Sequence, residues 1–74
     1  MIQEDWNKQA ANLLKAELTR LGIGYEGLIE KLKAIGVDES YKGIAAKINR
    51  GTFSFAFFMQ CMKAIHQKTV RLED

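Results

Sequence analysis

Apolar residues recur along this chain every three or four positions, in four successive segments separated by glycine or short polar stretches. This spacing is typical of amphipathic helices, and no segment alternates with the period of two that a half-buried strand requires. The four apolar stripes are Trp6, Ala10, Leu13, Leu14, Leu18 and Leu21; Leu28, Ile29, Leu32 and Ile35; Tyr41, Ile44, Ala45 and Ile48; and Phe55, Phe58, Met59, Met62 and Ile65. The pattern predicts a compact all-α bundle without a sheet.

Residues that typically start or end helices lie at the boundaries of the same four segments. The candidate N-caps are Asp5 for the first helix, Asp38 or Ser40 for the third, and Thr52 or Ser54 for the fourth. Gly22 and Gly36 each precede an apolar residue, which is the sequence of a left-handed C-terminal cap. We therefore expect the first two helices to end at these glycines and a short third helix to end before Gly51.

The length of 74 residues allows one domain, 1–74, with frayed ends at about 1–4 and 69–74. Cys61 is the only cysteine and His66 the only histidine. An intrachain disulfide and a structural zinc site, which needs about four such ligands, are therefore excluded. No apolar run reaches the roughly 18 residues of a membrane span, and the polar N-terminus is unlike a signal peptide. The sequence predicts a soluble cytoplasmic protein without membrane contact.

Charge is divided unevenly along the chain, although the formal net charge is only +2. Residues 1–39 hold five basic and seven acidic side chains, whereas the segment from Ser40 to Leu72 has no Asp or Glu. Its six cations are Lys42, Lys47, Arg50, Lys63, Lys68 and Arg71. A surface of one sign attracts the phosphates of a nucleic acid. The alternative is a solvated basic face without a partner.

The third helix is expected to present small and basic residues to solvent. With its apolar stripe inward, the outward face is centred on Gly43, Ala46, Lys47 and Arg50 and flanked by Lys42 and Asn49. Lys and Asn bond base edges, an alanine methyl meets the thymine methyl, and Arg holds phosphate, so this face suits a DNA major groove. The alternative is that Gly43 costs little in a first turn and Ala46 is a good helix former.

The order of these elements resembles the helix-turn-helix domain of the phage-repressor and Cro superfamily, over about residues 10–68. The resemblance is carried by Gly22-Ile23, Leu28-Ile29, the Gly36 turn, Lys47-Ile48-Asn49-Arg50-Gly51, and Ser54 before an apolar helix. It implies a lambda-repressor-like bundle of four or five helices that binds double-stranded DNA. The stretch Lys47–Ser54, with Gln60-Cys61 downstream, also resembles a small family of uncharacterised bacterial domains.

Counted back from Gly51, the repressor pattern implies base-reading side chains at Lys42, Gly43 and Lys47. The outward face adds Ala46 and Asn49. Contacts to the DNA phosphates are expected from Tyr25, Tyr41, Arg50, Thr52, Ser54, Lys63 and Lys68. The chain departs from the pattern in a longer second helix and turn, and in Ile29 where alanine is typical. Leu18 and Asn49 also stand where the superfamily often has an Arg–Glu ion pair.

The fourth helix carries more apolar residues than one core stripe requires. We expect Phe55, Phe58, Met62 and Ile65 to fill the core. The adjoining stripe, Phe57, Cys61 and Ala64, is then half exposed and is predicted to be a homodimer or partner face. The alternative is that Trp6 and the N-terminal segment cover this stripe.

No constellation in the sequence indicates catalysis. Cys61 is expected to be a buried small hydrophobe rather than a nucleophile. His66 has no acidic residue within a helical turn, and we expect it to cap a helix end or contact phosphate. There is no P-loop, paired-carboxylate or Ser/His/Asp signature. We predict no enzymatic activity, cofactor, metal site or small-molecule substrate.

The leading prediction is a small DNA-binding regulator of transcription that inserts its third helix, about 40–50, into the major groove. The first alternative is a protein–protein interaction module, antitoxin-like or an adaptor, that uses the apolar face of the fourth helix. A third possibility is RNA binding, in which the basic half recognises structure rather than sequence.

Overall fold

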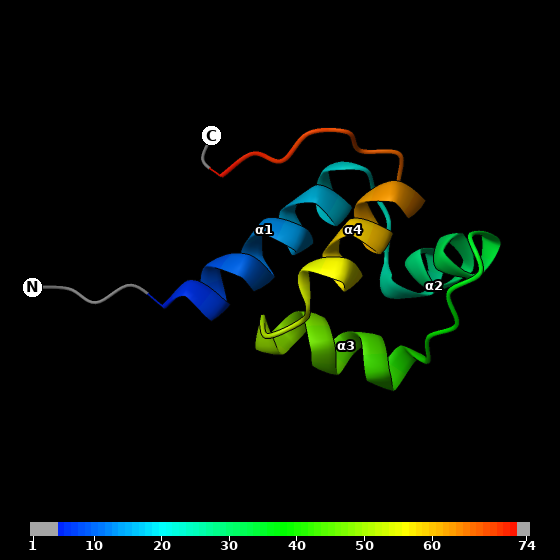
Figure 1. The fold of residues 1–74 in the computed structure, drawn as a ribbon, viewed down its shortest axis with the longest axis horizontal. Helices are drawn as coiled ribbons and strands as arrows, with labels where there is room; N and C mark the ends of the chain where they lie inside the picture. The colour runs from blue at the N-terminus through cyan, green and yellow to red at the C-terminus, as the bar shows by residue number, and fades with distance from the viewer. Residues whose placement is uncertain (1–4, 73–74) are drawn as a thin grey trace, which may run out of the picture.

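Four α helices account for the regular structure of residues 5–72, which are the residues that the computed structural model describes (Figure 1). They are α1 (Trp6–Arg20), α2 (Tyr25–Ala34), α3 (Tyr41–Arg50) and α4 (Phe55–Ala64). No strand occurs in that range, so the all-α prediction is confirmed. Of the expected frayed ends, 1–4 and 73–74 lie outside the described residues, whereas 69–72 follow α4 without helical structure.

Side-chain caps start three of the helices. The Asp5 carboxylate accepts a hydrogen bond from the backbone N–H of Lys8 at 3.0 Å. The hydroxyls of Ser40 and Ser54 accept equivalent bonds, each 3.0 Å long, at the starts of α3 and α4. Ser40 is therefore the cap of α3, rather than Asp38. Capping hydrogen bonds of this kind stabilise a helix by about 1 kcal/mol each.

Three helices end in the same left-handed C-terminal motif. Gly22 (φ 70°), Gly36 (φ 86°) and His66 (φ 60°) each occupy the left-handed position. The next residue then bonds back to the last turn, through Ile23 N–H to Leu18 O, Val37 N–H to Leu32 O and Gln67 N–H to Met62 O, each at 2.9 Å. The predicted place of His66 at a helix end is confirmed, and it takes a conformation that usually belongs to glycine.

The core lies where all four helices meet. α3 packs against α1 and α2, and α2 packs against α4. The fully buried side chains are Leu14 from α1, Leu28 and Leu32 from α2, Ile44 and Ile48 from α3, and Cys61 from α4. The apolar stripes predicted for the first three helices therefore supply the core, except at their ends.

The fourth helix buries more of its surface than predicted. Phe58, Met62 and Ile65 lie in the core as expected, but Phe55 does not, and the adjoining stripe is buried as well. Phe57, Cys61 and Ala64 are at most 5% exposed, so the expectation that they form a half-exposed face is wrong. Phe55, expected in the core, is 73% exposed, and Met59 on the same face is 57% exposed. Every residue of α4 except Gln60 and Lys63 is apolar, so periodicity alone could not fix its rotation.

The loop before α4 contributes to this difference. Phe53 stacks on Phe58 with ring centroids 6.3 Å apart and lies 5.7 Å from Phe57. These contacts favour the rotation of α4 that buries Phe57. Trp6 is 71% exposed, so it does not cover α4 in the way that the alternative required.

Candidate nucleic-acid interface

The outward face of α3 carries a strip of small and polar side chains. Because Ile44 and Ile48 are buried, the opposite side of the helix faces solvent. We call Lys42, Ala46, Asn49 and Arg50 the α3 strip; all four are exposed, and they lie within an arc of about 100°. α3 contains no Asp or Glu, so nothing on the helix itself neutralises these side chains.

Gly43 lies in the first turn of α3, beside the capping residue Ser40. A Cβ at this position would lie 2.9 Å from the capping hydroxyl of Ser40, which bonds the Gly43 N–H. A larger residue would require the Ser40 hydroxyl to shift slightly. The residue is half buried, so the structure places it beside the α3 strip rather than at its centre.

Lys47 lies on the side of α3 that faces α4. Its Nζ is 2.7 Å from Oε2 of Glu39 and 4.8 Å from the centroid of the Phe57 ring. The carboxylate and the aromatic face both attract the ammonium group. Lys47 is thus tied within the chain, whereas the α3 strip makes no such pairs among residues 5–72.

The end of α3 rests directly on the start of α1. Gly51 is buried in the left-handed conformation (φ 69°), and a Cβ there would lie 1.7 Å from the carbonyl oxygen of Asn7. Only a glycine permits this approach. The contact holds Asn49 and Arg50 next to the first turns of α1.

A polar hollow of about 470 Å³ lies beside this contact. The side chains that give it its character are Asn7, Lys8, Asn12 and Lys15 from α1, with Asn49 and Arg50 from α3. We call it the α1–α3 hollow. Lys8, Lys15 and Arg50 make no ion pair within residues 5–72. The hollow therefore presents cations and amide groups together.

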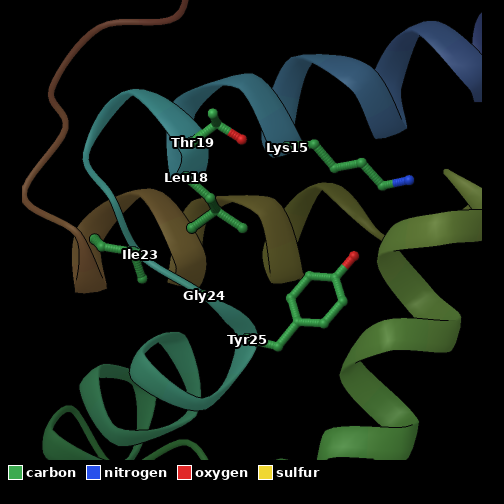
Figure 2. A pocket seen from close by; sticks show the side chains of 6 residues that line it. All are labelled: Lys15, Leu18, Thr19, Ile23, Gly24 and Tyr25. Atoms are coloured by element: carbon green, nitrogen blue, oxygen red, sulfur yellow. The ribbon is translucent and has the colours of Figure 1, made fainter.

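A second, more apolar hollow lies at the start of α2, and Lys15 also lines it. Figure 2 shows the side chains of Lys15, from α1, and Tyr25, from the first turn of α2, extending into the same space. The Tyr25 ring meets Tyr41 edge to face at 5.7 Å. Tyr41 is 55% exposed, so it is not the core residue that the apolar stripe predicted. The structure does bring together the two tyrosines that were predicted to contact phosphate.

A family model matches residues 6–70, which include all four helices. The chain belongs to the DUF6471 family. That family is described as a domain of unknown function, which fits the predicted resemblance to an uncharacterised domain family. No curated protein and no solved structure matches the chain.

The DUF6471 domain does not bring all of the predicted phosphate contacts to the α3 strip. Thr52 and Ser54 lie in the short loop after α3, but the Ser54 hydroxyl is engaged as a helix cap. Lys63 and Lys68 lie in and beyond the last turn of α4, about 15 Å along the helix from that loop. Figure 1 shows this end of α4 well away from α3.

Sequence reasoning missed Lys8, Asn12 and Lys15. They belong to the half of the chain in which acidic residues outnumber basic ones, so the charge count directed attention elsewhere. Two of those acidic residues are paired: Glu17, only 5% exposed, binds Arg20, and Glu39 binds Lys47. The spacing of Lys8, Asn12 and Lys15 along one helix face was the available signal.

In the part of the chain that the structure describes, Cys61 is a free and buried thiol. Burial, with a smaller contribution from Glu39, raises the pKa of the Cys61 thiol to about 12, so the thiol stays protonated at neutral pH. Within residues 5–72 no three His, Cys, Asp or Glu side chains gather in a way that could hold a metal ion. No helix in the same range is long and apolar enough to cross a membrane.

Proposed function

We propose that this domain binds double-stranded DNA by inserting α3 into the major groove, as a small helix-turn-helix regulator of transcription. The observation that carries the proposal is the α3 strip, which has small, cationic and amide side chains and no carboxylate. A major groove about 12 Å wide admits one α helix, and phosphates line both of its edges. A helix that offers donors and little bulk suits that space.

The proposal extends to a lambda-repressor-like arrangement, in which α2 and α3 form the helix-turn-helix pair. α2 and α3 pack against each other and are joined by residues 35–40. The contact between Tyr25 and Tyr41 sets the start of α2 beside the start of α3. In helix-turn-helix proteins the first helix of the pair crosses the DNA backbone while the second reads the groove.

Within this proposal each member of the strip has its own role. Lys42 and Asn49 bond base edges, and the Ala46 methyl group contacts a thymine methyl. Arg50 contacts a phosphate at the edge of the groove. Lys47 supports α3 through Glu39 instead of reading a base, because its ammonium group is already engaged.

Titration of the purified domain with random duplex DNA, followed by fluorescence anisotropy at several salt concentrations, tests the proposal. We expect log affinity to fall linearly with log salt, with a slope of about 0.9 for each phosphate contacted. Absence of binding at low salt would contradict the proposal. Equal binding of duplex RNA would favour recognition of structure over groove reading.

A variant pair then tests the α3 strip. On a selected cognate site, Lys42→Ala should weaken binding by about 1–3 kcal/mol and should weaken random duplex much less. Lys63→Ala removes the same charge at the far end of α4 and serves as the control. Equal losses of DNA affinity in the two variants would show that Lys42 acts only through its charge and does not read a base.

The exposed face of α4 favours a second candidate function, a protein–protein interaction module of the antitoxin-like or adaptor kind. Phe55 and Met59 lie one turn apart and are largely exposed. Such a strip suits either a partner helix or a second copy of the chain. This function predicts that Phe55→Glu abolishes partner binding, whereas Lys42→Ala leaves it unchanged.

A further inference from the structure

We propose that the α1–α3 hollow is a phosphate-binding site. The hollow shares Asn49 and Arg50 with the α3 strip, but its other polar side chains come from α1 and its cap, so the site goes beyond the base-reading role of α3. The site binds a phosphate group, supplied either by a nucleic-acid backbone or by a free phosphate compound. It does not depend on α3 entering a groove.

The donors that line the hollow match the chemistry of a phosphate. Lys8, Lys15 and Arg50 supply positive charge, and none of them is neutralised by an ion pair within residues 5–72. Asn7 and Asn12 add amide groups that donate hydrogen bonds. Phosphate oxygens accept several hydrogen bonds at once, and bonds to a charged group are about twice as strong as neutral ones.

One carboxylate, Asp5, also lines the hollow. Its Oδ1 accepts the hydrogen bond from the Lys8 backbone N–H at 3.0 Å, so the carboxylate is oriented toward the first turn of α1. Three cations remain against this single anion. The local charge therefore stays positive, which favours an anionic ligand.

The backbone holds the two sides of the hollow in place. The close contact between Gly51 and the Asn7 carbonyl joins the end of α3 to the first turn of α1. Asn7 makes this contact and Arg50 directly precedes Gly51, so the backbone positions of Asn7 and Arg50 are held close to each other. A site whose two walls are already docked loses less conformational entropy when it binds a ligand.

NMR titration of the ¹⁵N-labelled full chain with inorganic pyrophosphate tests the site directly. We expect saturable shifts concentrated on the backbone amides of Asn7, Lys8, Asn12, Asn49 and Arg50. Shifts that are spread evenly over the exposed cations, or that gather at another face, would overturn the proposal. The same spectra report whether each variant is folded.

Three variants separate a built site from diffuse charge. Lys8→Gln combined with Lys15→Gln should weaken pyrophosphate binding at least tenfold, and Asn12→Ala, which keeps every charge, should weaken it several-fold. The control combines Lys63→Gln with Lys68→Gln and removes equal charge outside the hollow. If the control weakens binding as much as the hollow variant, or if Asn12→Ala has no effect, the site is not present.

Duplex DNA distinguishes the source of the phosphate. If the hollow binds the nucleic-acid backbone, pyrophosphate competes with duplex, and the Lys8→Gln/Lys15→Gln variant lowers the salt slope by about 0.9 for each phosphate that it no longer binds. If the ligand is a free phosphate compound, pyrophosphate binds while duplex affinity is unchanged in that variant. Because the variant leaves Lys42 and Ala46 intact, sequence preference is retained wherever groove reading operates, so the two proposals fail separately.

Discussion

Gly51 shows how one residue without a side chain can determine the position of a helix. Two requirements coincide there, a left-handed backbone with φ 69° and a distance of 1.7 Å between a built Cβ and the Asn7 carbonyl oxygen. The first costs an L-residue about 1–2 kcal/mol, and the second requires the backbones of α1 and α3 to separate. The contact therefore contributes to stability and to the shape of the α1–α3 hollow.

Gly51→Ala should lower the free energy of unfolding by about 3 kcal/mol or more, because strain and a backbone clash act together. Gly36→Ala is the matched control: Gly36 has φ 86°, but a Cβ there meets nothing within 4 Å. Its cost should stay near 1 kcal/mol. Urea denaturation followed by circular dichroism measures both values, and equal losses would show that the Asn7 contact is unimportant.

Cys61 links burial to pH dependence. Its pKa is raised from 9.0 to about 12 by burial, with a smaller contribution from Glu39. In the unfolded chain the thiol ionises near its ordinary pKa, whereas the folded chain retains the proton. The stabilisation is therefore complete below about pH 9 and is lost as the pH rises toward 12.

Wild-type stability should fall more steeply than that of Cys61→Ala between pH 9 and 11, when the free energy of unfolding is measured in urea. Cys61→Ala is less stable at every pH because it leaves a cavity. The two proteins are therefore compared by how steeply the free energy of unfolding falls with pH, not by its absolute value. All other side chains are the same in the two proteins, so the difference in slope reports the thiol. Parallel curves would show that the thiol ionises in the folded state.

The helix α3 has one face that is open to solvent and a second face on which Lys47 is paired within the chain. The α3 strip faces solvent, whereas Lys47, about 60° beyond Arg50 around the helix, binds Glu39 and lies over Phe57. Glu39 comes from the turn before the Ser40 cap and is the carboxylate that the structure brings onto α3. The Lys47–Glu39 pair leaves one cation unavailable to a bound polyanion and places a carboxylate that repels the polyanion on the same surface.

Glu39→Gln should strengthen binding to random duplex several-fold at low salt and steepen the salt slope by about 0.9, because Lys47 becomes available. Its effect on stability should be below about 1 kcal/mol, since the Lys47 side chain is partly exposed. Glu30→Gln removes the same charge from an exposed position on α2 and is the control. The same gain in both variants would assign the effect to net charge.

The elements themselves were largely predictable because their signals are local. Ser40 and Ser54 cap helices as their sequence contexts indicate, and Gly22 and Gly36 adopt the left-handed caps expected of them. The burial of α4 was only partly predictable. Phe58, Met62 and Ile65 are buried as expected. The burial of Phe57 was not predictable, because nearly all faces of α4 are apolar and the contacts of Phe53 form only in the folded state. Periodicity assigns a face only when the opposite face is polar.

The candidate interface was harder to predict because it depends on contacts between distant segments. The engagement of Lys47 requires Glu39 to fold back at the start of α3. The α1–α3 hollow requires Gly51 to meet Asn7, 44 positions earlier in the chain. Counting the charged residues in each half of the sequence reveals neither the Glu39–Lys47 pair nor the contact between Gly51 and Asn7.

At the scale of the whole molecule, the α3 strip and the exposed apolar pair of α4 lie on different helices. The α3 strip and the α1–α3 hollow offer donors and cations, whereas Phe55 and Met59 expose apolar surface on α4. α4 follows α3 after a short loop, so both surfaces belong to one helical bundle. A second copy bound through α4 would place two α3 strips in one assembly, as half-site recognition requires.

Phe55 and Met59 alone would bury too little surface for a tight dimer. A large aromatic side chain buries about 150–250 Å², whereas a stable interface buries about 800 Å² per partner. We therefore expect a weak dimer whose population rises with protein concentration and with binding to a two-site duplex. Sedimentation velocity over a range of concentrations should show this shift for the wild type.

Phe55→Glu should abolish that shift while leaving the helical circular dichroism unchanged, because Phe55 is 73% exposed and contributes little to the core. Phe57→Glu cannot serve this purpose, since Phe57 is buried and a carboxylate there would unfold the domain. Ala56→Glu, on the neighbouring exposed position of α4, controls for charge. A wild-type chain that stays monomeric at every concentration and on a two-site duplex would exclude the α4 dimer and leave α3 to act as a single reading helix.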